Sequence, residues 1–125
     1  MPTALEKLLR SQGQQVPPPV SGFALIDTGA TKSAVDDQVI RSLKVAPIGK
    51  ITSHTAGGVV SQNLYPVRFY FPVNKWMIEF SSVVGVNLKA YAVMGKNLVA
   101  LVGRDVLSRC IFIYNGTAAS FTVAF

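Results

Sequence analysis

From Val20 onward the sequence predicts a mainly β domain that contains two short helices. Short apolar runs alternate with turns rich in glycine, proline and asparagine, which is typical of strands joined by tight connections. Residues 67–71 show the clearest pattern, because three apolar side chains alternate with Arg68 and Tyr70 as in a half-buried antiparallel strand. Strands and helices do not alternate along the chain, so a doubly wound parallel sheet is not expected.

The first 19 residues differ from the rest and are expected to form an N-terminal arm or linker before a domain at residues 20–125. The leucines within residues 4–11 have helical spacing, which predicts one or two amphipathic turns. Residues 13–19 end in three consecutive prolines. This segment should be an extended connector, because proline does not fit inside a helix or a central strand.

Turn signals divide the domain into short elements. Ala56-Gly57-Gly58 is expected to be a hairpin tip, and Asn115-Gly116 is a second hairpin signal. A helix is expected where acidic residues precede an apolar run, since the helix dipole favours negative charge in the first turn. The expected strands are 23–26, 50–55, 59–71, 76–84, 98–102, 110–114 and 120–125, and the expected helices are 36–43 and 103–109.

The composition fits one compact domain and excludes several function classes. The chain has 125 residues, of which 50% are hydrophobic and 14% are charged, which argues against disorder. The net charge of +6 would permit nucleic-acid binding, but the 12 Lys and Arg residues are scattered, so no nucleic-acid partner is expected. No apolar run is long enough for a membrane span and no signal peptide begins the chain, so we expect a cytoplasmic protein without a membrane partner.

Cysteine and histidine each occur once, as Cys110 and His54. A single cysteine excludes an internal disulfide and a cysteine cluster, and a single histidine excludes most histidine-based metal sites. We therefore expect neither a metal nor a cofactor. Cys110 is interpreted as a small buried hydrophobe. His54 is interpreted as a surface strand residue, with contact to a substrate as the alternative.

Asp27 stands out among the acidic residues, because the apolar run 23–26 leads directly into it and a glycine turn follows. An isolated carboxylate beside apolar residues is costly unless it is paired or protonated. A structural explanation is an Asx turn at the end of a strand. The functional explanation is a catalytic carboxylate, which would need a second acid or base nearby.

The chain has six acidic residues, so candidate partners of Asp27 can be compared one by one. Four have structural interpretations, two as solvated glutamates and two at the start of a helix: Glu6, Glu79, Asp36 and Asp37. Asp105 is the only other carboxylate next to a buried strand, and it is expected to cap the second helix. The partner is therefore Asp105 or Asp27 of a second copy. Two such carboxylates would share a proton in a twofold homodimer, one as base and the other as acid.

Asp27-Thr28-Gly29-Ala30 after an apolar strand resembles the active-site signature of the retropepsin-like (retroviral-type) aspartic proteases, the single-lobed homodimeric relatives of pepsin. Residues 54–60 resemble the flap of that family, residues 101–105 its second signature, and residues 121–125 its terminal strand. The resemblance covers residues 20–125. It implies a closed β-barrel with two short helices, a β-hairpin flap, and a homodimer that hydrolyses peptide bonds in protein substrates without a cofactor.

The resemblance also implies roles for single residues. Asp27 and its symmetry mate would activate a water held between them. Thr28 would hydrogen-bond across the dimer axis, Gly29 would allow close approach of substrate backbone, and Arg104 would brace the active-site loop, which includes Ala30. The flap would bind substrate through His54, Thr55, Ala56, Gly57, Gly58, Val59 and Val60. The dimer interface would be formed by Thr28 and by the terminal strand: Ser120, Phe121, Thr122, Val123, Ala124 and Phe125.

The sequence departs from the retroviral pattern directly after the motif. Many retroviral members carry acidic residues there that pair with the arginine and contact substrate, whereas this chain has Thr31 and Lys32. Arg104 then needs other acceptors, such as backbone carbonyls, and the peptide preference should differ. The hydroxyl at this position is closer to bacterial and cellular members than to processed viral enzymes.

Two other functions compete with proteolysis. A catalytically idle retropepsin-like module could bind peptides or mediate dimerisation, although the complete Asp-Thr-Gly signature argues against it. A basic β-barrel could bind nucleic acid, which a salt-dependent affinity for oligonucleotides would reveal.

Overall fold

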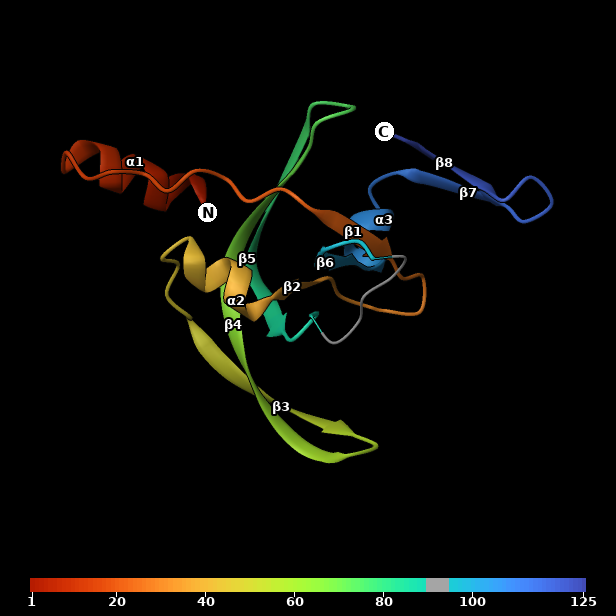
Figure 1. Ribbon diagram of the computed structural model, residues 1–125, viewed down its shortest axis with the longest axis horizontal. Helices are drawn as coiled ribbons and strands as arrows, with labels where there is room; N and C mark the ends of the chain where they lie inside the picture. The colour runs from red at the N-terminus through yellow and green to blue at the C-terminus, as the bar shows by residue number, and fades with distance from the viewer. Residues whose placement is uncertain (90–94) are drawn as a thin grey trace.

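The computed structural model describes residues 1–89 and 95–125, apart from the side chain of Thr55. Six strands form one sheet in the order β1-β6-β2-β5-β4-β3, and β7 and β8 form a separate hairpin (Figure 1). The elements in chain order are α1 (Thr3–Ser11), β1 (Phe23–Ile26), β2 (Ala34–Asp36), α2 (Asp37–Ser42), β3 (Gly49–Thr55), β4 (Gly58–Phe71), β5 (Trp76–Val86), β6 (Leu98–Val102), α3 (Arg104–Leu107), β7 (Ile111–Asn115) and β8 (Ser120–Ala124).

The sheet combines parallel and antiparallel pairs. Strands β3, β4 and β5 form an antiparallel meander, whereas β2 runs parallel to β5 and antiparallel to β6. Strand β1 pairs with β6 in parallel, with Ile26 opposite Val102. Two segments that are far apart in the sequence are thereby placed side by side, and the loops that follow them leave the same end of the sheet.

The prediction of a mainly β fold with short helices is confirmed, but the expected closed barrel is wrong. Within the described residues the six-stranded sheet is open, with β1 and β3 as its two edges. The last two strands pair only with each other, because the turn after Asn115 places them side by side as an antiparallel hairpin. No strand is then left to connect the two edges. The three-residue strand β2 was not expected, since it is too short to show an alternating pattern.

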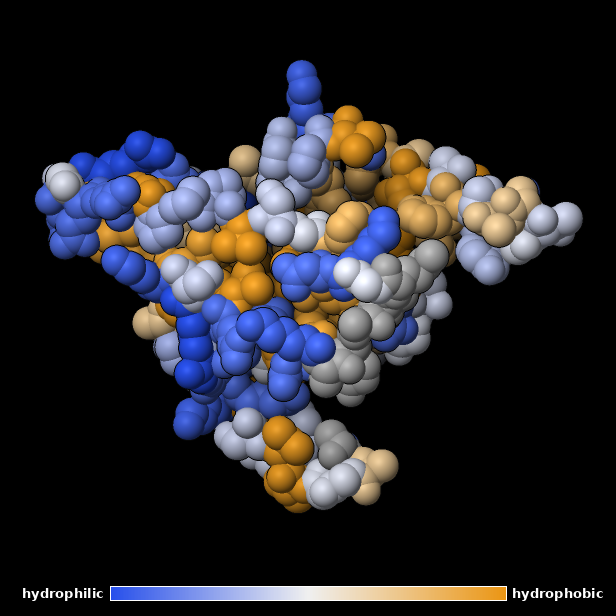
Figure 2. Space-filling view, in the orientation of Figure 1, coloured by the Kyte–Doolittle hydropathy of each residue, from blue (hydrophilic) through white to orange (hydrophobic). Residues whose placement is uncertain are grey.

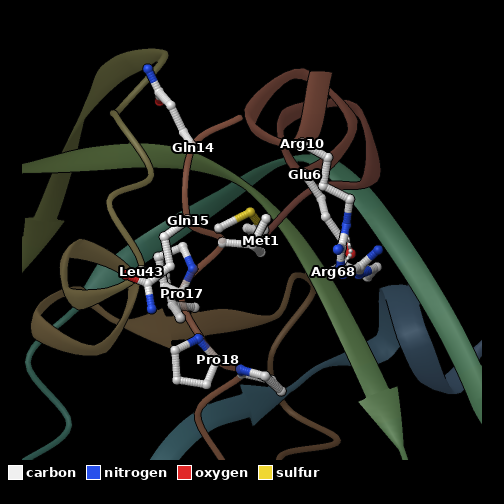
Figure 3. Close-up of a pocket in the computed structure, with 11 residues that line it drawn as sticks. Met1, Glu6, Arg10, Gln14, Gln15, Pro17, Pro18, Leu43 and Arg68 are labelled. Carbon is white, nitrogen blue, oxygen red and sulfur yellow. Dashed lines mark hydrogen bonds and ion pairs between the residues drawn. The ribbon is translucent and has the colours of Figure 1, made fainter. Parts of the chain in front are cut away.

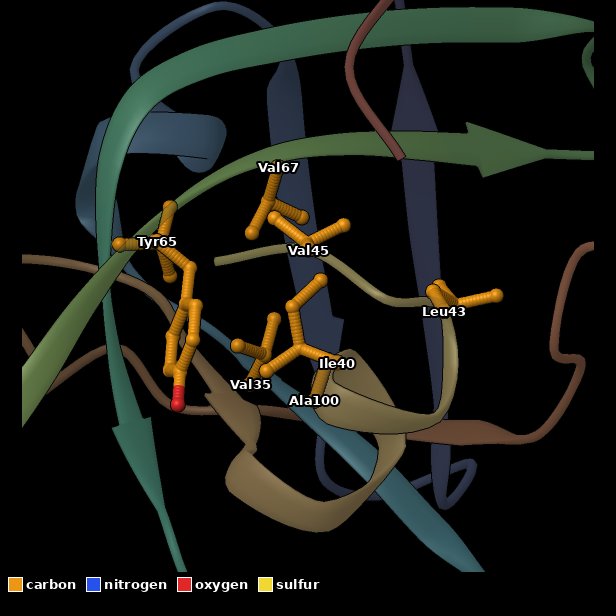
Figure 4. Packing of buried hydrophobic residues seen from close by; sticks show 8 residues of the cluster. Val35, Ile40, Leu43, Val45, Tyr65, Val67 and Ala100 are labelled. Atoms are coloured by element: carbon orange, nitrogen blue, oxygen red, sulfur yellow. The ribbon is translucent and has the colours of Figure 1, made fainter. Parts of the chain in front are cut away.

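The main core lies where α2 packs against the sheet (Figure 4). Tyr65 is its largest member and is fully buried, and its hydroxyl donates a 2.6 Å hydrogen bond to Asp37 Oδ1. The Tyr65 ring requires glycine at position 85, because a Cβ there would lie 2.7 Å from Tyr65 Cε2. The buried members of this cluster are Val35, Ile40, Leu43, Val45, Tyr65, Val67, Val83 and Ala100.

A second, smaller core cluster fixes α3 to the sheet. It consists of Ile78 from β5, Val102 from β6 and Val106 from α3. At the start of β5, the centroid of the Trp76 ring lies 4.0 Å from the centroid of the Phe125 ring. The C-terminal residue is thereby attached to the long β4–β5 hairpin.

The N-terminal arm packs against β4 and β5 through polar and apolar contacts. Glu6 forms a 2.6 Å ion pair with Arg68, and the backbone N–H of Thr3 donates to Glu79. Met1 and Leu5 pack against the main core. A cavity of about 440 Å³ lies between α1, the proline-rich segment, Leu43 and Arg68 of β4, as Figure 3 shows. In the described part of the chain, no helix has the length and apolar character that crossing a membrane requires.

Candidate active site

Asp27 lies directly after β1, at the point where the chain turns away from the sheet. Its backbone N–H donates to the Val102 carbonyl at 2.9 Å, which continues the pairing of β1 with β6 by one residue. Its carboxylate oxygen Oδ1 accepts a 2.9 Å hydrogen bond from the N–H of Gly29, and its carbonyl accepts one from Ala30. The Asx turn expected as a structural alternative is therefore present. It leaves Oδ2 without a hydrogen-bond partner among the described residues.

Arg104 holds the loop that carries Asp27. Its guanidinium donates to the Thr28 carbonyl at 2.9 Å and to Thr31 Oγ1 at 3.0 Å. Its backbone N–H donates to the Ala30 carbonyl at 2.9 Å. These contacts agree with the prediction that Arg104 uses a backbone carbonyl where an acidic side chain is absent. The short loop is tied to the start of α3 at three points, so its shape depends on β6 and α3 as well as on its own sequence.

Asp105 is neither a helix cap nor a partner of Asp27 in this structure. Its Oδ2 accepts a 2.9 Å hydrogen bond from the N–H of Ser33, and its Oδ1 accepts a 2.6 Å bond from Ser33 Oγ. Gly103 is the N-cap residue of α3, and its N–H donates to Ser33 Oγ at 2.9 Å. Both oxygens of Asp105 are therefore engaged in holding the end of the active-site loop.

Gly103 allows this contact because it has no side chain. A Cβ at that position would lie 2.7 Å from the backbone carbon of Lys32 and 3.0 Å from the Ala30 carbonyl oxygen. The backbone of the Asp27 loop thus packs directly on the backbone that leads into α3. The contact was not predicted from the sequence, since the buried Ser33 looks like an ordinary loop residue.

The other carboxylates lie in structural contacts elsewhere. Asp36 caps α2, because one oxygen accepts from Val39 N, and its second oxygen accepts from Leu88 N. Asp37 pairs with Arg41 and Tyr65, and the two glutamates hold the arm. Within one chain no second carboxylate is available to Asp27. No group of His, Cys, Asp and Glu residues that could hold a metal ion occurs in the described ranges.

The hairpin expected at residues 54–60 is present as the tip of β3 and β4. His54 is opposite Val59 and Thr55 is opposite Gly58, with Ala56 and Gly57 in the turn. Gly58 has a φ of 117°, a conformation that residues with a side chain rarely adopt. The side chains of His54, Val59 and Val60 are exposed. The tip therefore offers apolar surface to its surroundings, and its action as a substrate flap stays a prediction.

The C-terminal hairpin leaves large apolar side chains exposed. Ile113 in β7 is 56% exposed and Phe121 in β8 is 59% exposed. Figure 2 shows hydrophobic residues over this hairpin on the right of the molecule, whereas the outer surface of α1 on the left is mostly hydrophilic. Phe23 in the edge strand β1 is also exposed. Exposed apolar residues that gather on one part of a surface are typical of association sites in proteins. Residues 120–125, expected to form an interface strand, lie on it.

The comparison with known proteins bears on the same segments. Residues 19–106 match the model of a family described as aspartyl protease. This range begins before β1 and ends within α3, so it includes Asp27, the β3–β4 hairpin and Arg104. No curated protein and no solved structure shows a significant match to the chain.

Proposed function

Because the chain belongs to the retropepsin-like aspartyl protease family, we propose that it is a homodimeric aspartic endopeptidase in which Asp27 of each copy is catalytic. One observation carries the proposal. Asp27 is the only one of the six acidic residues whose carboxylate is not held by another element of the chain, and it lies half-buried directly after β1. Hydrogen bonds of Arg104 and Ser33 connect its loop to the start of α3. A catalytic side chain requires a fixed position of this kind.

A second copy is needed because one chain supplies one suitable carboxylate. Two Asp27 carboxylates that face each other cannot both ionise, so the pair holds a single proton. The oxygen of a water held between them then attacks the scissile carbonyl carbon, while the ionised member removes a proton from this water and the protonated member donates its proton to the carbonyl oxygen. The product of this step is a neutral tetrahedral diol. Its collapse transfers a proton to the leaving amine, and no covalent intermediate is required.

The exposed apolar surface supports the dimer. Residues of β1 and of the β7–β8 hairpin would be covered by the second copy, and a hairpin that pairs only with itself has little stability of its own. The hydroxyl of Thr28 has no hydrogen bond within the described chain, while the Thr28 carbonyl is held by Arg104. The Thr28 side chain is therefore available for a contact across the dimer axis.

Asp27→Asn tests the proposal directly. A peptide library incubated with wild-type protein from acidic to neutral pH should show cleavage, and the variant should lose it by a factor of about 10² to 10⁴ or more. Glu79→Gln is the matched control, because it also removes one carboxylate, but from a residue of β5 that contacts the N-terminal arm. Its rate should be that of the wild type.

Two results would refute the assignment. Cleavage by Asp27→Asn at the wild-type rate would exclude Asp27 as the catalytic residue. Full activity of a strict monomer, measured by sedimentation at the assay concentration, would exclude the shared site. A stable dimer that cleaves no peptide and binds no statine-type analogue of the tetrahedral diol would instead identify an idle peptide-binding or dimerisation module.

A further inference from the structure

In the active-site loop, residues 27–33, Asp27 is the only acidic residue and Lys32 is the only basic one. Residues 90–94 contain no charged side chain, so all charged side chains of the protein lie in the described ranges. Apart from Asp27, every carboxylate is held in a structural contact: Glu6, Asp36, Asp37, Glu79 and Asp105. Asp105 contacts this loop, but its carboxylate accepts hydrogen bonds from Ser33 and from the N–H of Val106 and forms no ion pair in the described chain.

Two cations lie on or against this loop without a carboxylate partner. The Arg104 guanidinium hydrogen-bonds only to uncharged oxygens, the Thr28 carbonyl and Thr31 Oγ1. Lys32 is the next residue along the loop, is exposed, and forms no ion pair within the described chain. Neither cation therefore forms an ion pair with a carboxylate in the described part of the chain.

The backbone of Lys32 is held in place on both sides. Thr31 before it is bound by Arg104, and Ser33 after it is 2% exposed and is bound by Asp105. The Lys32 carbonyl also packs against Gly103, where a Cβ would come within 2.8 Å of its oxygen. A flexible ammonium group thus extends from a fixed point five residues after Asp27. In Figure 1 this loop and the tip of the β3–β4 hairpin extend to the same side, away from α1.

We propose that this site selects substrates that carry an aspartate or glutamate close to the scissile bond, and that Lys32 recognises that carboxylate. The inference rests on the proposed function, because it names the substrate class of the same site. Lys32 is exposed, so its ion pair with substrate is partly screened by water and salt. We expect a preference of about two- to fivefold in kcat/KM at low ionic strength, which decreases as salt is added.

The test uses one peptide that the wild-type dimer cleaves, with Glu, Gln or Lys placed in turn at each position flanking the cleaved bond. Wild type should favour Glu over Gln and Gln over Lys at one or more positions. Lys32→Gln should remove this preference, and Lys32→Glu should reverse it. Lys7→Glu is the matched control, because it makes the same change of charge on the exposed surface of α1. It should keep the wild-type preference.

Binding provides a readout that does not depend on cleavage. The affinity of the Asp27→Asn protein for fluorescent Glu, Gln and Lys peptides should follow the same order, and Lys32→Glu in that background should reverse it. Equal binding and equal cleavage of the three peptides would overturn the inference while the protease assignment stands. An equal effect of Lys7→Glu would also overturn it, since net charge rather than Lys32 would then be responsible. If no peptide is cleaved, the proposed function fails, and the binding order decides the inference alone.

Discussion

Ser33 Oγ donates a 2.6 Å hydrogen bond to Asp105 Oδ1 and accepts a 2.9 Å bond from the N–H of Gly103. This hydroxyl connects the end of the Asp27 loop to the start of α3, across about 70 residues of sequence. Buried polar groups stabilise a structure when each has its partner, and they cost free energy when one partner is removed. The orientation of the active-site loop therefore depends on a residue outside the Asp-Thr-Gly signature.

Ser33→Ala should lower the free energy of unfolding by about 1–3 kcal/mol, because it leaves the buried N–H of Gly103 without its partner and removes one of the two hydrogen bonds that Asp105 Oδ1 accepts. Urea denaturation followed by the fluorescence of Trp76 measures the change. Ser42→Ala is the control, since its hydroxyl is exposed and only contacts the Val39 carbonyl at the end of α2. Equal stability of Ser33→Ala and the wild type would contradict the bridging role.

Gly103→Ala should be the most damaging single-methyl change near the site. The added Cβ would overlap the backbone of Lys32, and backbone cannot move aside as a flexible side chain can. Overpacking of this kind costs about 1–3 kcal/mol or more. Gly49→Ala is the matched control, because its Cβ would meet only Leu64 Cδ1, at 3.9 Å. Thermal unfolding of the two variants should differ clearly, and similar midpoints would refute the close backbone contact.

The strands on either side of the site could be predicted from local pattern. Residues 23–26 and 98–102 are apolar runs that end at a turn, and both are strands. Their parallel pairing could not be predicted, because no local signal states which strands become neighbours. Arg104 illustrates a partial success. The missing acidic residue after the motif indicated that it needs other acceptors, and the structure supplies the Thr28 carbonyl and Thr31 Oγ1.

The errors have physical causes that can be named. Ser33 was missed because its burial depends on Asp105, and a polar loop residue carries no sign of such a distant partner. The closed barrel was inferred from the family resemblance. The turn signal at Asn115-Gly116 indicated a self-paired hairpin, which is what β7 and β8 form. The local turn pattern was the better guide to this part of the fold.

The arm should lose its attachment in acid. The hydrogen bond from Arg68 lowers the pKa of Glu6, and the contact with Thr3 lowers the pKa of Glu79. A carboxyl group whose pKa is lower in the folded state adds stability above its unfolded pKa, about 4.3 for glutamate, and this stability is lost as pH falls through the folded value. The urea midpoint should therefore decrease as the pH is lowered from 6 to 3.

Glu6→Gln separates this effect from general acid unfolding. The variant should be less stable than wild type at pH 6 and should show a smaller decrease between pH 6 and pH 3, because one of the two perturbed groups no longer titrates. Lys7→Gln is the control, as it alters the same helix without removing a carboxylate. The linkage would be refuted if Glu6→Gln kept the full pH dependence of the wild type.

Phe121→Asp should separate the proposed dimer into monomers and abolish proteolysis together. Phe121 is exposed on β8, and its burial against a second copy would stabilise the dimer, whereas a buried unpaired carboxylate would be costly there. Ile48→Asp is the matched control, because Ile48 is equally exposed at 59% but precedes β3, away from the C-terminal hairpin. The dimer, measured by sedimentation, and peptide cleavage should both be lost in Phe121→Asp and kept in Ile48→Asp. A dimeric and fully active Phe121→Asp protein would show that the two copies meet through another surface.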